Sequence, residues 1–172
     1  ARERGYVTIL DAKRGDIGVS ARHYAAFAFD AMGADALTVN AYLGADSLEA
    51  YLERSDDLAR EGRGGRGIFV LVRTSNPGSD ALQSRRLEDG STAAEAMARL
   101  VAGIGAGRRG ASGISDVGAV VAATKPEDAR ALRGILPDAM LLVPGYGAQG
   151  GGAESVRDLF ATRDARAIVT AS

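Results

Sequence analysis

The sequence predicts an α/β fold in which parallel strands alternate with helices. Short apolar runs rich in β-branched residues recur along the chain, segments with helical periodicity separate them, and capping residues stand at helix starts. The chain has 172 residues, 46% of them hydrophobic and 25% charged, which is ordinary for a globular protein. Because no change in composition divides it, we expect a single domain over residues 1–172.

Six apolar runs are the candidate strands. The first covers residues 6–10 and is apolar almost throughout, as expected of a strand that is covered on both faces. The others follow in order at residues 36–40, 67–72, 117–122, 139–143 and 166–170.

The segments between these runs have the apolar spacing of helices. The expected buried residues of the first two helices are Ala21, Tyr24, Ala25, Ala28 and Phe29, and then Leu48, Tyr51, Leu52 and Leu58. Helix starts are predicted where a capping oxygen precedes a carboxylate by three residues. Such pairs are Asp46 with Glu49, Thr92 with Glu95, and Thr124 with Glu127.

The number of strands leaves two architectures open. A barrel of ~250 residues uses about 31 residues for each β-α unit, so this chain provides roughly five and a half units. Six strands do not close such a barrel. The alternation therefore predicts either an open doubly wound sheet or a (β/α)8 barrel from which two units are absent.

Charge and composition exclude several classes of function. The 21 basic and 22 acidic residues nearly balance, so we expect no nucleic-acid or membrane partner. There is no cysteine and only one histidine, His23, which we expect to be an ordinary helix residue, so thiol chemistry and a histidine-rich metal site are excluded. No apolar run reaches the roughly 20 residues of a membrane helix. We expect a cytoplasmic protein whose acid-base chemistry uses Asp, Glu, Lys or Tyr.

The first candidate site follows the first apolar run. Side chains two apart on a strand point to the same side, so Asp11 and Lys13 are expected to project together, with Asp16 just beyond them. Gly15 and Gly18 would let a ligand approach the backbone closely. An ammonium group between carboxylates is a candidate proton donor, although an isolated Asp-x-Lys pair is more often a surface salt bridge.

Two further strand ends carry polar or flexible residues. Residues 143–152 form a glycine-rich segment before a helical pattern with Val156, Leu159 and Phe160, which favours a phosphate cradle or, equally, a surface loop. Residues 72–78 carry Thr, Ser and Asn, which can bind a polar heterocycle but are also common in turns.

Taken together, the three strand-end motifs resemble those of the orotidine 5'-phosphate decarboxylase family, specifically its longer bacterial subgroup. They are Asp-Ala-Lys-Arg-Gly-Asp-Ile from Asp11, Thr-Ser-Asn-Pro-Gly from Thr74, and Pro-Gly-Tyr-Gly-Ala-Gln-Gly from Pro144. The resemblance implies a (β/α)8 TIM barrel, with barrel strands three to eight in this chain. It also implies a homodimer that converts orotidine 5'-monophosphate to uridine 5'-monophosphate and carbon dioxide in pyrimidine biosynthesis, with no metal or organic cofactor.

The resemblance assigns roles residue by residue. Asp11 matches the aspartate that faces the substrate carboxylate, and Lys13 matches the lysine that protonates C6. Asp16 matches the aspartate that reaches into the neighbouring subunit's site, with Ile17 beside it, and Ser20 stands where the family usually has Thr.

The other two motifs correspond to the substrate-binding segments. Ser75 matches the serine that contacts the pyrimidine. Residues 144–151 match the segment that closes over the phosphate, and its expected substrate-binding residues are Pro144, Gly145, Gln149 and Gly150.

Three family positions have no counterpart in this chain. The family has a further catalytic lysine and a ribose-binding aspartate on the first two barrel strands, and a phosphate-binding arginine after the last. We expect these residues before Ala1 and after Ser172, so that the chain is a barrel domain without its first two β-α units and its C-terminal end.

Two alternative functions remain open. A 3-keto sugar-phosphate decarboxylase of the same superfamily shares the Asp-x-Lys-x-x-Asp arrangement, but the Thr-Ser-Asn-Pro-Gly motif and Gln149 favour the pyrimidine nucleotide. A non-catalytic nucleotide-phosphate binding protein is the alternative from another class, and the charge cluster of Asp11, Lys13 and Asp16 argues against it.

Overall fold

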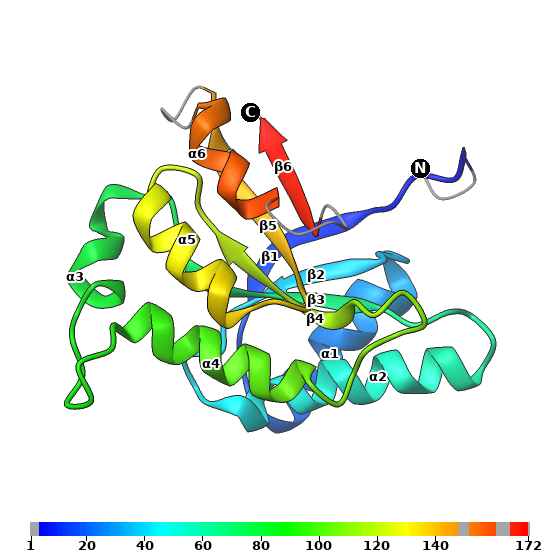
Figure 1. Cartoon of the computed structure of the whole chain (residues 1–172). Coiled ribbons are helices and arrows are strands. Elements are labelled where there is room, and N and C mark those ends of the chain that lie inside the picture. The colour runs from blue at the N-terminus through cyan, green and yellow to red at the C-terminus, as the bar shows by residue number, and fades with distance from the viewer. Residues whose placement is uncertain (1–3, 148–151, 161–165, 172) are drawn as a thin grey trace. The chain divides into compact units, whose positions relative to one another are not determined.

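The computed structural model describes residues 4–147, 152–160 and 166–171 (Figure 1). The chain forms two compact units, Ala1–Leu71 and Val72–Ser172, and each is described by itself. None of the helices in the described ranges has the length and apolar character needed to cross a membrane.

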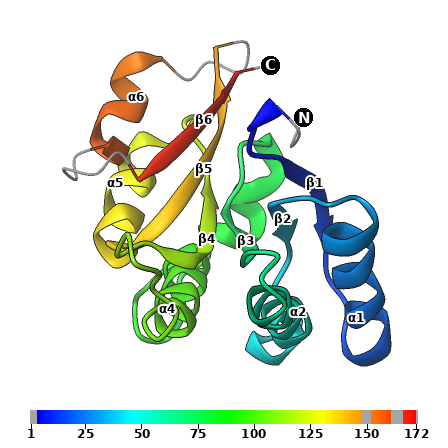
Figure 2. The same ribbon diagram turned by 90° about the vertical axis from the view of Figure 1, so that its right-hand side faces the viewer.

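The first unit contains three strands and two helices. Its elements are β1 (Ile9–Arg14), α1 (Gly18–Ala26), β2 (Ala36–Val39), α2 (Glu49–Arg60) and β3 (Gly67–Arg73), whose last two residues belong to the second unit. The strands are parallel, with Ile9 opposite Ala36 and Ala36 opposite Gly67. A π-helical turn, Phe27–Ala31, continues α1, and a 3-10 turn, Ala45–Leu48, precedes α2. The two helices lie side by side (Figure 2).

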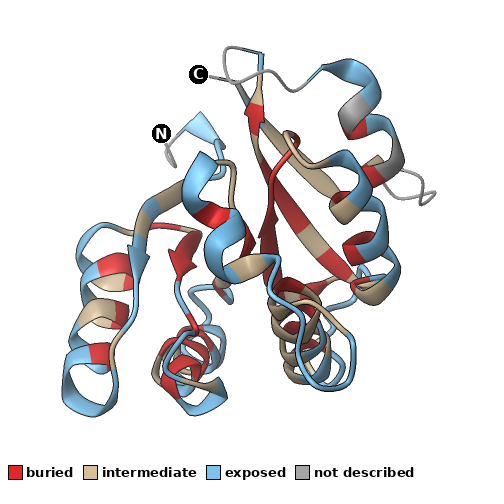
Figure 3. Cartoon of the chain, turned by 90° about the vertical axis from the view of Figure 1, so that its left-hand side faces the viewer, coloured by how far each residue is buried: buried red, intermediate tan, exposed pale blue. Residues whose placement is uncertain are grey.

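The predicted apolar stripes form the core of this unit. Ala21, Ala25, Ala28 and Phe29 are buried and Tyr24 is half-buried, while Leu48, Tyr51, Leu52 and Leu58 are all buried (Figure 3). All four residues of β2 are buried as well, as expected of a strand that is covered on both faces.

The second unit repeats the same alternation. After β3 come α3 (Asp80–Gln83), α4 (Ala93–Gly105), β4 (Ser115–Val121), α5 (Pro126–Ile135), β5 (Ala139–Tyr146), α6 (Ala153–Arg157) and β6 (Ala167–Ala171). Strands β4, β5 and β6 are parallel neighbours in that order. The buried residues of β4 and β5 form the core on which α4 and α5 pack.

One of the three predicted helix caps is present. Thr92 and Glu95 form a complete capping box, in which each side chain accepts a hydrogen bond from the backbone N–H of the other. The prediction is wrong for the other two pairs. Gly44 begins the 3-10 turn before α2, and Lys125 precedes Pro126 at the start of α5, so Asp46 and Thr124 make no capping bond.

The first strand also starts later than the sequence predicts. It covers Ile9–Arg14 rather than residues 6–10, and Tyr6 and Val7 are 66% and 75% exposed. The ladder with β2 begins at Ile9. Before it, the Thr8 backbone N–H donates to the carboxylate of Asp35, and the Thr8 carbonyl accepts from the backbone N–H groups of Asp35 and Ala36. The charged residues that follow the apolar run therefore lie within the strand.

Candidate active site

Asp11 and Lys13 form a direct ion pair on β1. The Nζ atom of Lys13 lies 2.6 Å from Oδ1 and 2.7 Å from Oδ2 of Asp11, so the ammonium group donates to both carboxylate oxygens. Thr38 on β2 completes the group, because its hydroxyl donates to Asp11 Oδ1 at 2.9 Å and accepts from the Lys13 backbone N–H at 2.9 Å. One hydroxyl thus holds both charged residues against the neighbouring strand.

A bulge in β1, rather than regular strand alternation, brings the two side chains together. Leu10 pairs with Leu37 and Arg14 pairs with Val39, so four steps along β1 correspond to two along β2. Within this bulge Lys13 has a φ of 48°, the only positive value among the described residues other than glycine. A side chain in this region is strained, by about 1–3 kcal/mol, and such strain is typical of functional sites.

The pair keeps Asp11 ionised. Partial burial by itself would raise the pKa of Asp11, but hydrogen bonds from Lys13 and Thr38 and the positive charge of Lys13 outweigh it, so the pKa lies below its ordinary value. Both side chains remain open to solvent, Lys13 at 52% and Asp11 at 61% exposure. The structure therefore presents a fixed anion beside an accessible ammonium group.

Asp16, Ile17 and Ser20 occupy the connection from β1 to α1. Asp16 is half-buried and accepts a hydrogen bond of 2.8 Å from the backbone N–H of Ile17. In the described ranges no ion pair joins Asp16 to Lys13, so the expected ammonium group between two carboxylates is not formed within this chain. Ile17 is the N-cap of α1 and is 57% exposed, and Ser20 is exposed in its first turn.

Contacts within the chain shape this connection. A Cβ atom on Gly15 would lie 2.8 Å from the carbonyl oxygen of Asn40, which follows β2, so the glycine allows these two backbone segments to approach closely. The guanidinium group of Arg14 lies 5.3 Å from the centre of the Tyr24 ring. Burial, together with the negative charge of Asp16, raises the pKa of Tyr51 to about 12, which leaves its phenol neutral.

The second unit contributes the two remaining predicted segments. Ser75 is half-buried in the turn after β3, between Thr74 and Asn76, whose side chains are joined by a 2.7 Å hydrogen bond. Pro144 and Gly145 lie within β5 rather than in the predicted loop, since the strand extends to Tyr146. The strand bulges at this point, because Val143 pairs with Val169 and Tyr146 with Ala171. Gln149 and Gly150 lie outside the described residues.

Backbone hydrogen bonds place these two segments at the same edge of the sheet. Ala122, just after β4, donates to the carbonyl of Arg73 at 2.8 Å, and the next residue, Ala123, donates to the carbonyl of Pro144 at 2.9 Å. The Ser75 turn and the Pro144–Gly145 bulge therefore flank the C-terminal end of β4. Ligands bind at this edge in parallel α/β folds.

Two residues at the sites were not predicted from the sequence. Thr38 stands in an otherwise apolar strand and is 1% exposed, and Arg73 ends another such strand and is 2% exposed. A polar residue within or directly after an apolar run is the only local sign of either. The partners of Thr38 are 25 and 27 residues away in the sequence, and those of Arg73 are 6 to 55 residues away, so the spacing does not reveal them.

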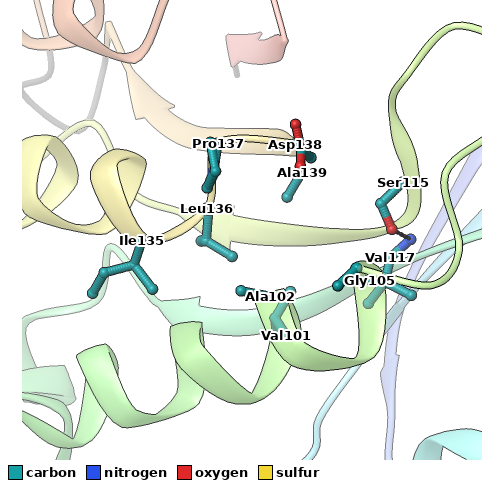
Figure 4. A pocket seen from close by; sticks show the side chains of 11 residues that line it. Val101, Ala102, Gly105, Ser115, Val117, Ile135, Leu136, Pro137, Asp138 and Ala139 are labelled. Atoms are coloured by element: carbon teal, nitrogen blue, oxygen red, sulfur yellow. Dashed lines mark hydrogen bonds between the residues drawn. The ribbon is translucent and has the colours of Figure 1, made fainter.

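A cavity of about 210 Å³ lies elsewhere in the second unit, between α4, α5 and the first residues of β4 and β5 (Figure 4). Mostly apolar residues line it, with Ser115 and Asp138 at its edge. It is smaller than the roughly 300–1,000 Å³ of typical ligand sites, and it lies at the N-terminal ends of the strands. The cavity is therefore not a candidate for the active site.

The chemistry available at the candidate site is proton transfer and electrostatic stabilisation. A carboxylate held ionised beside an ammonium group can oppose an anionic substrate group, and the ammonium group can donate a proton. Among the described residues there is no cluster of three or more histidine or carboxylate side chains that could hold a metal ion.

Known proteins with similar sequences and folds match almost the whole chain. A model of the orotidine 5'-phosphate decarboxylase / HUMPS family matches residues 1–170. The chain is 45% identical to the orotidine 5'-phosphate decarboxylase of Rhodopirellula baltica, over 100% of this chain and 57% of that protein. It is 44% identical to that of Roseiflexus castenholzii, over 99% of this chain and 58% of that protein.

A solved structure shows the same fold. That of Leishmania donovani OMP decarboxylase matches with a TM-score of 0.79 and 34% identity, over 96% of this chain and 58% of that one. This likeness confirms the predicted (β/α)8 barrel fold and excludes the open doubly wound sheet. The chain spans just over half the length of the relatives that it matches.

Proposed function

Because the chain belongs to the orotidine 5'-phosphate decarboxylase / HUMPS family, we propose that the protein converts orotidine 5'-monophosphate to uridine 5'-monophosphate and carbon dioxide. The observation that carries this proposal is the group formed by Asp11, Lys13 and Thr38. It places a fixed carboxylate beside an accessible proton donor. A decarboxylation without a cofactor requires both groups.

The proposed reaction uses both charges. The substrate carboxylate lies beside ionised Asp11, and their repulsion disappears when carbon dioxide leaves. The bond between C6 and the carboxylate carbon breaks, and its electron pair stays on C6. The ammonium group of Lys13 stabilises this carbanion and transfers one proton to C6, which leaves Lys13 neutral until it takes a proton from solvent.

Thr38 supports this reaction by fixing the geometry. Its bonds to Asp11 and to the Lys13 backbone hold the strained bulge, so the charges do not have to reorganise when the substrate binds. Asp11 accepts two of the three N–H donors of Lys13, and the third remains for the substrate.

Ser75, Pro144 and Gly145 form the proposed substrate-binding part of the second unit. The Ser75 turn would contact the pyrimidine ring. The Pro144–Gly145 bulge leads into the segment with Gln149 and Gly150, which would bind the phosphate. Phosphate binding away from C6 supplies energy that can be used to organise the reacting groups.

We also propose that the protein works as a homodimer in which Asp16 and Ile17 serve the neighbouring subunit's site. Asp16 makes no ion pair with Lys13 within this chain, as described above, and apolar side chains next to it face solvent. Ile17 is 57% and Val19 61% exposed, and Tyr42 and Leu43 after β2 are 74% and 52% exposed. A partner subunit would cover such a surface.

The cytoplasmic location and the single domain stay predictions.

The proposed activity is tested with the full-length natural protein by following the absorbance change when orotidine 5'-monophosphate is decarboxylated. We expect turnover by the wild type and a loss of more than about a thousandfold in kcat for Lys13→Met. Arg60→Met, which removes an exposed cation paired with Asp57, is the control and keeps wild-type activity. A folded wild type that turns over a 3-keto sugar phosphate, or that binds nucleotide inhibitors without turnover, overturns the proposal.

The shared site is tested by mixing two inactive homodimers, Lys13→Ala and Asp16→Ala. If Asp16 acts across the interface, subunit exchange creates hybrid dimers with one site that carries both native residues, and activity returns. Exchange that is demonstrated by mass spectrometry without any return of activity contradicts this assignment.

A further inference from the structure

Arg73, at the C-terminal end of β3, uses all five of its N–H donors inside the second unit. Its Nε donates to Asp128 at 2.7 Å and its Nη1 donates to Ser79 at 3.0 Å and Gln83 at 3.3 Å. Its Nη2 donates to Asp80 and, at 3.1 Å, to Ser84. The side chain is 2% exposed, and the guanidinium fork is the only side chain that offers five donors in this arrangement.

One of these partners, Gln83, also bonds the turn that carries Ser75. Gln83 accepts a 2.9 Å hydrogen bond from the Thr74 backbone N–H, and its amide donates to the Thr74 hydroxyl at 2.9 Å. Thr74 in turn donates to Asn76. The residues on both sides of Ser75 are therefore held by a network that starts at Arg73.

A second set of contacts anchors the network to α5. Asp128, in the first turn of α5, accepts from Arg73, and Lys125 pairs with Asp80 at 2.7 Å. The Ser75 turn is thus tied to the helix that follows β4. This gives it a fixed position at the edge of the sheet where Pro144 and Gly145 also lie.

A structural requirement alone does not explain so polar a cluster. Taking an arginine out of water is costly, and buried ion pairs are often replaced by apolar residues with no loss of stability. A plain turn between β3 and α3 would need no buried cation. The cluster is better suited to keeping the Ser75 turn in one conformation.

We propose that Arg73 is a positioning residue that sets the place of Ser75 toward the pyrimidine ring of the substrate. The inference rests on the proposed function. Arg73 does not touch the substrate and acts only through the Gln83–Thr74 link, so its effect depends on the presence of the Ser75 hydroxyl.

A double-mutant cycle in the full-length protein tests this dependence. Arg73→Lys keeps the charge but has three donors instead of five, and we expect kcat/KM for orotidine 5'-monophosphate to fall roughly tenfold or more. Ser75→Ala is expected to lower it similarly. If Arg73 acts through Ser75, the double variant is no worse than Ser75→Ala by more than about twofold, whereas independent effects would multiply.

Two further variants keep the test decisive. Gln83→Ala cuts the link to Thr74 and leaves the other Arg73 bonds in place, so it gives the same non-additivity with Ser75→Ala even if Arg73→Lys folds poorly. Arg108→Lys is the matched control, because Arg108 pairs with Asp116 between α4 and β4, far along the chain from the turn, and it leaves kcat/KM unchanged.

Ligand binding separates positioning from general loss of structure. Arg73→Lys is expected to weaken binding of uridine 5'-monophosphate and to leave binding of ribose 5-phosphate, which lacks the pyrimidine, within about twofold. Equal weakening of both ligands, or multiplicative effects in the cycle, overturns the role of Arg73 while the wild-type turnover still supports the decarboxylase. A wild type without turnover overturns the proposed function itself.

Discussion

The hydroxyl of Thr38 on β2 donates a 2.9 Å hydrogen bond to Oδ1 of Asp11 on β1. The Thr38 hydroxyl also accepts from the backbone N–H of Lys13, whose φ of 48° is strained. One buried side chain on the neighbouring strand therefore holds both the Asp11 carboxylate and the Lys13 backbone in place.

Thr38→Val is expected to lower kcat without unfolding the protein. The variant keeps the shape of the side chain but removes two hydrogen bonds and leaves the Lys13 amide without its partner. We expect the activation free energy to rise by about 1–2 kcal/mol, which lowers kcat roughly 5- to 30-fold. Steady-state kinetics measure the loss, and circular dichroism reports the fold.

Thr8→Val is the matched control for this prediction. The Thr8 hydroxyl bonds the carboxylate of Asp35 near the start of β1, away from the charged pair. We expect a small loss of stability and unchanged kcat. Equal kinetic losses in the two variants would show that Thr38 matters only for the fold.

Asp80 is expected to stabilise the protein in a pH-dependent way. Hydrogen bonds from Arg73 first, and then from Lys125 and Ser84, hold the pKa of Asp80 well below its usual range. The folded state then binds fewer protons than the unfolded state, so the contribution is complete above the ordinary carboxyl pKa of about 3.9 and is lost as pH falls toward the folded pKa.

Urea unfolding at several pH values measures this contribution. We expect the wild type to be more stable than Asp80→Asn at pH 7 and the difference to shrink below about pH 4. A difference that is constant from pH 7 to pH 2 would contradict ionisation as its cause.

Gly15→Ala is expected to disturb the connection between β1 and α1. The new Cβ atom would lie 2.8 Å from the carbonyl oxygen of Asn40, so the backbone at one of these two residues must shift, at a cost of about 1–3 kcal/mol. Thermal unfolding measures this cost. Gly103→Ala in α4 is the control, because nothing lies within 4 Å of its added Cβ atom and alanine favours the helix.

The two threonines that the sequence presents as helix caps are expected to behave differently. Thr92→Ala removes a complete capping box and should cost about 1 kcal/mol of stability. The Thr124 hydroxyl is buried with no hydrogen-bond partner among the described residues, so Thr124→Ala should be neutral or slightly stabilising. Chemical unfolding of both variants checks the contrast, and equal losses would show that Thr124 is a cap.

Elements and candidate residues could be predicted wherever the signal is local. The buried stripe from Leu48 to Leu58 and the Thr92 capping box depend on spacings of three or four residues, and both are present. The predicted cap at Asp46 is wrong, because Gly44 and the 3-10 turn after it begin that helical segment instead. The spacing of Asp46 and Glu49 gives no sign of this 3-10 geometry.

The sequence by itself determined the β-α alternation and the candidate residues for the chemistry, since periodicity and side-chain type are local properties. Only the tertiary structure decided how those residues are held. The bulge at Lys13, the hydroxyl of Thr38 and the five bonds of Arg73 depend on partners from 6 to 55 residues away. Such pairings form only after the strands have aligned and water has been excluded, because polar groups that lose water need hydrogen-bond partners within the protein.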